Sequence, residues 1–110
     1  MFSRELKKGS TEMLVLSMLE QRSRHGYEIG KQIERASDGR LTFRIGSLYP
    51  ILCRLEDRGL IAGRWVERDG ERRRRYYRIT PHGRQALARE RELWREFVRT
   101  IEAIAGAGRG

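Results

Sequence analysis

The spacing of apolar residues changes twice along the chain, and these changes constrain the fold more than any other feature. Residues before 60 show helical spacing, whereas 61–68 and 73–80 alternate as strands do. Asp69-Gly70 between the two alternating stretches is a hairpin turn signal. Thr80-Pro81 is an N-cap followed by proline at the first helical position, and helical spacing returns until about Ala105. The predicted order is therefore helices, a β-hairpin and a long final helix.

Two helices are predicted before residue 40. The first begins at Ser10 or Thr11 and is apolar nearly all round, which is typical of a helix in the middle of a core. A polar break at 22–26 separates it from a second helix over 27–35. Gly30 inside that second helix marks a close approach of another helix, because glycine otherwise destabilises a helix interior.

A third helix carries the most complete end signals. Gly46 or Ser47 is its predicted N-cap, Pro50 falls in the first turn, and Gly59 is the glycine after its C-cap. Its apolar row, spaced by four and three residues, consists of Leu48, Leu52 and Leu55. The opposite face carries Tyr49, Arg54, Asp57 and Arg58. In the hairpin, the predicted inward residues are Trp65, Tyr77 and Ile79.

The final helix carries an apolar heptad pattern, interrupted by Glu90, that is typical of a dimer interface. The predicted interface residues are Leu87, Trp94, Phe97, Ile101 and Ile104. The expected fold class is therefore mostly α with a small β-hairpin, a winged helix-turn-helix followed by a C-terminal dimerisation helix. We expect residues 1–80 to form the DNA-binding domain, and 81–110 to form the dimerisation helix and a flexible tail.

The charge of the chain favours a polyanionic partner. Lysine and arginine total 24 against 15 aspartates and glutamates, a formal net charge of +9. An arginine-rich composition also follows from a G+C-rich genome. However, six arginines gather between Arg68 and Arg78, where a hairpin can present them to phosphates or a minor groove. The candidate DNA-binding residues are Arg44, Ser47, Tyr49, Arg54, Arg72, Arg73, Arg74 and Arg75.

Other function classes find little support. A single cysteine, Cys53, and two histidines exclude an intrachain disulfide and a cysteine-based zinc site. No catalytic constellation or phosphate-cradling glycine motif occurs, so we expect neither an enzyme nor a cofactor. His25 and Glu28 are better explained by a hydrogen bond at a helix start than by catalysis. Since the sequence shows no membrane span or signal peptide, we expect a cytoplasmic protein without a membrane partner.

Three segments resemble the PadR family of bacterial transcriptional regulators. They are HGYEI (25–29), GSLYPILCRLEDRGLI (46–61) and RRYYRITPHGR (74–84). The resemblance implies a homodimeric repressor of the short subfamily, with its DNA-facing helix at 47–58 and its wing at 64–78. It also implies an effector site for aromatic or cationic compounds between the paired final helices, where Trp94 and Phe97 are the candidates. The arginine-dense wing and Glu90 depart from the family pattern.

Two alternatives stay open beside a DNA-binding repressor whose operator is an inverted repeat. One is a small-molecule sensor with a secondary DNA role, using Trp94, Phe97 and Ile101 as its pocket. The other is an RNA-binding or sequence-neutral architectural protein, which would bind random duplex and its own promoter equally well.

Overall fold

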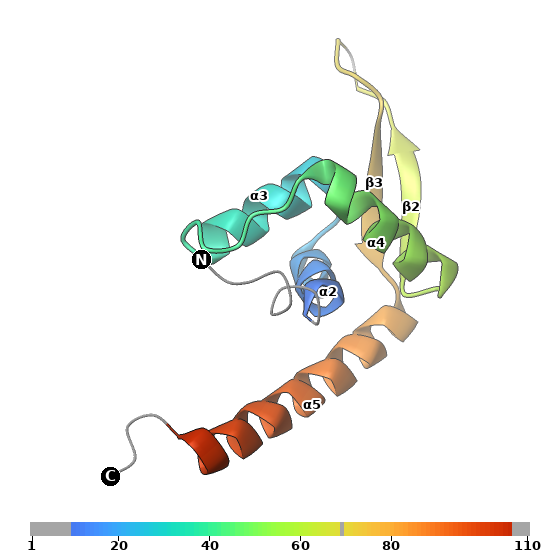
Figure 1. The fold of residues 1–110 in the computed structure, drawn as a ribbon. Helices are drawn as coiled ribbons and strands as arrows, with labels where there is room; N and C mark the ends of the chain where they lie inside the picture. The colour runs from blue at the N-terminus through green and yellow to red at the C-terminus, as the bar shows by residue number, and fades with distance from the viewer. Residues whose placement is uncertain (1–9, 69, 107–110) are drawn as a thin grey trace.

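The computed structural model of the chain describes residues 10–68 and 70–106. The elements in chain order are α2 (Thr11–Gln21), β1 (Arg24–His25), α3 (Gly26–Ala36), α4 (Ile45–Asp57), β2 (Ile61–Val66), β3 (Arg74–Ile79) and α5 (Pro81–Ala105). Figure 1 shows a helical body from which the β2–β3 hairpin projects on one side, while α5 extends away from the hairpin tip. This arrangement confirms the predicted winged helix-turn-helix with a long final helix. Asp69 and residues 107–110 of the predicted tail lie outside the described residues.

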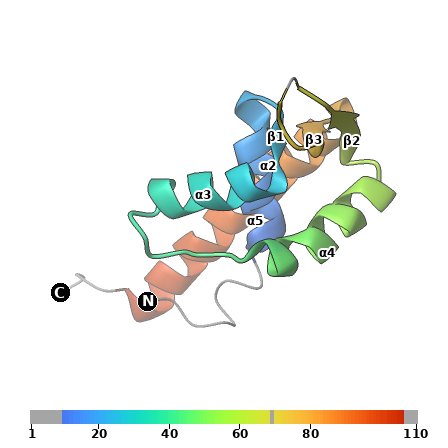
Figure 2. The ribbon, with the colours of Figure 1, turned by 90° about the horizontal axis from the view of Figure 1, so that it is seen from above.

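The helix α2 occupies the middle of the body, as its apolar circumference predicts. It contacts α3, α5 and β3, and its Val15, Leu16 and Leu19 are buried. Figure 2 shows the segment after α3 turning back along that helix before it enters α4. The row Leu48, Leu52 and Leu55 of α4 is completely buried in the same core. Each buried leucine of this kind stabilises the fold by roughly 1.5–3 kcal/mol relative to an exposed one.

Close packing between α3 and α4 depends on two glycines. A Cβ on Gly30 would lie 3.3 Å from Leu48 Cδ1 and from the Phe43 carbonyl oxygen, which confirms the predicted close approach. A Cβ on Gly26 would lie 2.5 Å from Ile45 Cδ1. The prediction for the start of α4 is wrong: the N-cap is Arg44, and Pro50 lies in the second turn. The helix begins earlier because Ile45 and Leu48 pack onto the glycine face of α3.

The end of α4 follows the sequence prediction. Gly59 adopts a φ of +75°, which glycine tolerates and other residues rarely adopt. The Leu60 N–H donates to the Leu55 carbonyl at 3.0 Å and the Gly59 N–H donates to the Glu56 carbonyl at 2.9 Å. This pair of bonds is a Schellman motif, and it turns the chain directly into β2.

The sheet has three antiparallel strands in the order β1-β3-β2, one more than predicted. The strand β1 is only two residues long, too short for any periodic pattern to reveal it. Tyr77 and Ile79 point inward as predicted. The prediction that Trp65 points inward is wrong, since 55% of this residue is exposed. Trp65 pairs with Arg75 in the register, at a level where the hairpin has already left the helical core.

The base of the hairpin is closed where β3 meets α5. The Thr80 N–H donates to the Leu60 carbonyl at 3.0 Å, and the Thr80 hydroxyl donates to the Gly59 carbonyl at 2.7 Å. The same hydroxyl oxygen accepts a hydrogen bond from the Gly83 N–H at 3.0 Å, which confirms Thr80 as the N-cap of α5. The two ends of the hairpin are therefore fixed to one point of the body.

The heptad residues of α5 divide into two groups. Leu87, predicted for the dimer interface, is instead 1% exposed within the core of its own chain, because this part of α5 packs on α2. Arg91 strengthens that packing through two hydrogen bonds to the Glu20 carboxylate, of 2.8 and 3.2 Å, which hold the pKa of Glu20 below its usual value. The other four are 45% to 80% exposed, and they are Trp94, Phe97, Ile101 and Ile104.

Candidate nucleic-acid interface

The outer face of α4 presents polar groups to the surroundings. Burial of Leu48, Leu52 and Leu55 turns the opposite side of the helix outward. The predicted residues on this surface are all exposed, and they are Arg44, Ser47, Tyr49 and Arg54. No atom lies within 4 Å of a Cβ built on Gly46, so the first turn is open to close approach by a partner.

The charge on α4 is distributed unevenly. At its C-terminal end, Glu12 of α2 accepts a hydrogen bond from Arg58 at 2.8 Å and lies 3.9 Å from Arg54. Arg44 at the other end makes no ion pair with any residue that the structure describes. The N-terminal turn of α4 therefore combines an available guanidinium with a helix start that its N-cap side chain does not cap, a combination that suits a phosphate.

The four predicted arginines of the wing occupy different environments. Arg72 is exposed and makes no ion pair within the described part of the chain. The Arg73 guanidinium lies 4.7 Å from the centroid of the Trp65 ring, a cation–π contact. Arg74 lies on the other face, with its Nη1 3.3 Å from Nε2 of His25. Arg75 is bound within the chain by Glu56, with its Nη2 2.6 Å from the carboxylate.

His25 closes the start of α3, as the sequence predicted. Its Nδ1 accepts a hydrogen bond from the Glu28 N–H at 3.3 Å. The ring also packs edge-on against Tyr76 of β3, with centroids 5.2 Å apart. Burial lowers the pKa of His25 below its ordinary 6.5, and the nearby Arg74 cation lowers it further.

Acidification should therefore destabilise the fold through His25. Because the folded pKa is depressed, the unfolded chain binds more protons once the pH falls below 6.5, and stability is lost from there toward the folded pKa. We expect urea unfolding to show a larger decrease in stability between pH 7.5 and 5.5 for the native protein than for His25→Asn. Asparagine keeps an N-cap acceptor that does not titrate. Equal pH dependence of the two proteins would contradict this role.

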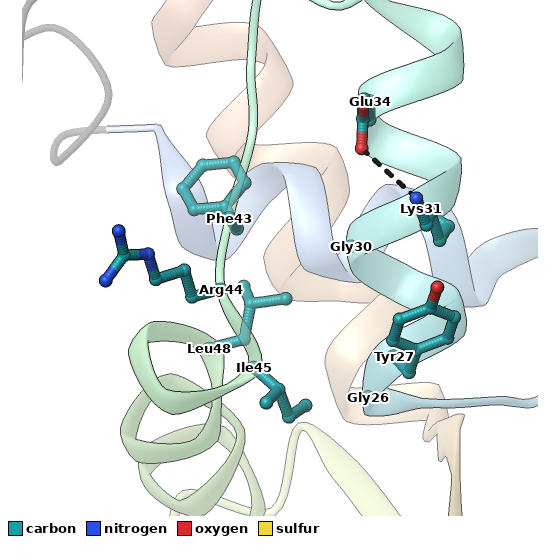
Figure 3. Close-up of a pocket in the computed structure, with 9 residues that line it drawn as sticks. All are labelled: Gly26, Tyr27, Gly30, Lys31, Glu34, Phe43, Arg44, Ile45 and Leu48. Atoms are coloured by element: carbon teal, nitrogen blue, oxygen red, sulfur yellow. Dashed lines mark ion pairs between the residues drawn. The ribbon is translucent and has the colours of Figure 1, made fainter.

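Sequence reasoning missed several exposed groups beside α4. A pocket of about 230 Å³ lies between α3 and the segment leading into α4, and Figure 3 shows Tyr27, Lys31 and Glu34 along its α3 side. Lys31 Nζ lies 5.7 Å from the centroid of the Tyr27 ring and 3.8 Å from Glu34. The motif HGYEI contains Tyr27, but only the packing of α3 shows that this side chain is exposed.

The described residues provide no metal centre. Across 10–68 and 70–106, no three histidine, cysteine, aspartate or glutamate side chains are grouped closely enough to hold a metal ion. No helix in the described part of the chain combines the length and the apolar character that crossing a membrane requires.

Known proteins with a similar fold are transcriptional regulators. A structure of a transcriptional regulator from Clostridium thermocellum is 32% identical, with a TM-score of 0.86 over 94% of this chain and 98% of that one. A PadR-like regulator from Bacillus cereus is 25% identical, with a TM-score of 0.79 over 94% of this chain and 98% of that one. A Mycobacterium tuberculosis transcriptional regulator is 39% identical over 72% of this chain, which spans only 60% of that protein.

One solved relative contains DNA. The Bacillus subtilis PadR structure, in complex with operator DNA, has a TM-score of 0.64 over 71% of this chain and 44% of that one. At 23% identity it shows a shared fold alone. The sequence profile of the transcriptional regulator PadR-like family matches residues 15–89, more than half of the chain. The chain therefore belongs to the PadR-like family, whose members are transcriptional regulators and not enzymes.

Proposed function

We propose that this protein is a homodimeric repressor that binds a double-stranded DNA operator with the symmetry of an inverted repeat. The observation that carries the proposal is the adjacency of two exposed basic elements. The helix α4 packs on β2, and the arginine-rich end of the hairpin projects beyond the body (Figure 1). An outer helix face with Ser47, Tyr49 and Arg54 suits a major groove, and a ribbon with Arg72 and Arg73 suits the neighbouring phosphates or minor groove.

The exposed row on α5 supports the dimer. Trp94, Phe97, Ile101 and Ile104 form a contiguous apolar surface, which soluble proteins usually cover with a partner. A second copy related by a two-fold axis would cover it and would place two α4 helices about one turn of DNA apart. In this proposal residues 1–80 bind DNA and 81–110 bring the copies together, although the first turns of α5 pack into the DNA-binding domain.

The salt dependence of DNA binding tests the wing. Each phosphate contact contributes roughly one unit to the slope of log affinity against log salt. We expect Arg72→Ala to lower the slope by about one unit and to weaken binding to every duplex, as measured by fluorescence anisotropy. Arg99→Ala on α5 is the matched control and should leave the slope unchanged. An unchanged slope in Arg72→Ala would reject the wing as a phosphate ligand.

Sequence preference tests α4. Selection from random duplexes with the native protein should yield an inverted repeat, and Tyr49→Phe or Arg54→Ala should alter the preferred bases. Equal affinity for the selected site and for random duplex would instead favour a sequence-neutral architectural protein.

We propose further that a planar aromatic or cationic effector releases the DNA by binding at the centre of the dimer. Trp94 and Phe97 support this site, because their exposed rings lie 5.9 Å apart and are tilted by 37°, a surface on which a planar compound can stack. Attraction of a cation to the Trp94 ring favours positively charged compounds. Such a ligand would act through its different affinities for two dimer shapes.

The effector site can be tested by fluorescence in a Trp65→Phe background, where Trp94 is the remaining tryptophan. Planar cationic dyes should quench its emission and lower operator affinity, and Trp94→Leu should abolish the effect on affinity. Quenching without any shift in operator affinity would exclude this mode of release.

A further inference from the structure

Glu56 connects α4 to both strands of the wing. It lies one turn after the buried Leu52, and its carboxylate points toward the sheet rather than toward the outer face of α4. Its Oε2 accepts hydrogen bonds from the Gly63 N–H of β2 at 3.1 Å and from Arg75 Nη2 of β3 at 2.6 Å. One carboxylate oxygen therefore joins three elements that are separate in the sequence.

The guanidinium of Arg75 is flanked by several groups at this junction. A Cβ on Gly63 would lie 2.7 Å from its Nε and 2.9 Å from its Cζ, so the group lies directly over the glycine. The rings of Trp65 and Tyr77 are 5.6 and 5.8 Å from the same Cζ. Arg75 is the partly buried member of the wing arginines, and its hydrogen bond to Glu56 raises its pKa.

We propose that Glu56 and Arg75 are positioning residues that set the angle of the wing relative to α4, so that both elements meet DNA in a fixed geometry. The inference rests on the proposed DNA binding and refines it, because it removes Arg75 from the set of phosphate ligands. An arginine–carboxylate contact has a defined direction, which suits it to orienting one element on another. Binding of a free arginine to a phosphate releases a counterion from the DNA. Because Glu56 already offsets the charge of Arg75, this arginine should contribute little to that release.

Arg75→Ala and Arg72→Ala form a matched pair that separates positioning from phosphate binding. We expect Arg75→Ala to leave the salt slope unchanged and to reduce, about tenfold, the preference for the selected site over random duplex. Arg72→Ala should lower the slope by about one unit and leave that preference unchanged. Thermal unfolding of each variant confirms that the fold is retained, since partly exposed ion pairs contribute little to global stability.

Glu56→Gln provides the complementary change. It removes the negative charge that neutralises Arg75 and leaves only a weaker, uncharged acceptor. We therefore expect the salt slope to rise by up to about one unit while preference for the selected site falls. The double variant Glu56→Gln/Arg75→Ala should lose no more preference than either single variant, because both remove the same connection.

Two results would overturn the positioning role while leaving DNA binding intact. One is a fall of about one unit in the salt slope for Arg75→Ala, and the other is additive loss of preference in the double variant. A native protein without salt-dependent DNA binding would overturn the proposed function itself and this role with it.

Discussion

Ile101→Glu should convert the protein from a dimer into a monomer and abolish binding to its operator. Ile101 lies in the exposed apolar row of α5, between Phe97 and Ile104. In a two-fold dimer the substitution acts twice, since each copy loses an apolar contact of roughly 1.5–3 kcal/mol and gains a carboxylate that must be desolvated. Sedimentation velocity at micromolar concentration should show the native protein as a dimer and the variant as a monomer.

Operator binding should be lost because the monomer no longer links two DNA-binding domains that occupy the two half-sites together. Linking two binding modules raises overall affinity by about 10² to 10⁴, and a monomer forfeits this gain. Arg99→Glu is the matched control, because it introduces the same carboxylate on a different face of α5. The control should remain dimeric. A native protein that sediments as a monomer would refute the dimer and leave the apolar row unexplained.

Gly83→Ala should destabilise the fold by about 3 kcal/mol or more, through a single added methyl group. A Cβ at this position would lie 2.0 Å from the Leu60 carbonyl oxygen and 2.8 Å from Ile79 Cγ1. The first contact is with backbone that already accepts a hydrogen bond from Thr80, so no side-chain rotation can relieve it. The start of α5 would have to move away from the body.

Gly46→Ala serves as the control for the glycine substitution. A Cβ there meets no atom within 4 Å, and alanine is the better helix former by about 1 kcal/mol. Urea unfolding should therefore show a stable or slightly stabilised Gly46→Ala beside a strongly destabilised Gly83→Ala. Equal stability of the two variants would mean that α5 is not closely packed at its start.

Local signals in the sequence predicted several element ends correctly. Thr80 caps the start of its helix with a side-chain hydroxyl that accepts a hydrogen bond from the Gly83 N–H, and Gly59 ends α4 with backbone hydrogen bonds to residues a few positions away. Because these partners are close in the sequence, the sequence alone is sufficient to predict both helix ends. The start of α4 was predicted wrongly because Ile45 is held by Gly26, nineteen residues earlier in the chain. The strand β1 was missed for a similar reason, since two residues become a strand only by pairing with β3.

In the candidate site too, features set by nearby residues could be predicted, whereas features set by distant contacts could not. Exposure of Arg44, Tyr49 and Arg72 follows from helix periodicity and from their position at the end of a hairpin. The pairing of Arg75 with Glu56 depends on how α4 rests against the sheet, which no spacing rule describes. One signal was present: Glu56 follows the buried Leu52 by one turn, so it could not share the outer face with Arg54.

The closed base of the hairpin has a consequence for how such regulators diversify. Because Thr80 is fixed to Gly59 and Leu60, both ends of the β2–β3 segment leave the body at one anchored point. Residues added or exchanged at the distal end should therefore change the length or the charge of the ribbon without shifting α4 or α5. We expect the remainder of the molecule to tolerate duplication, deletion and substitution there, so that the reach of the ribbon can evolve independently of folding.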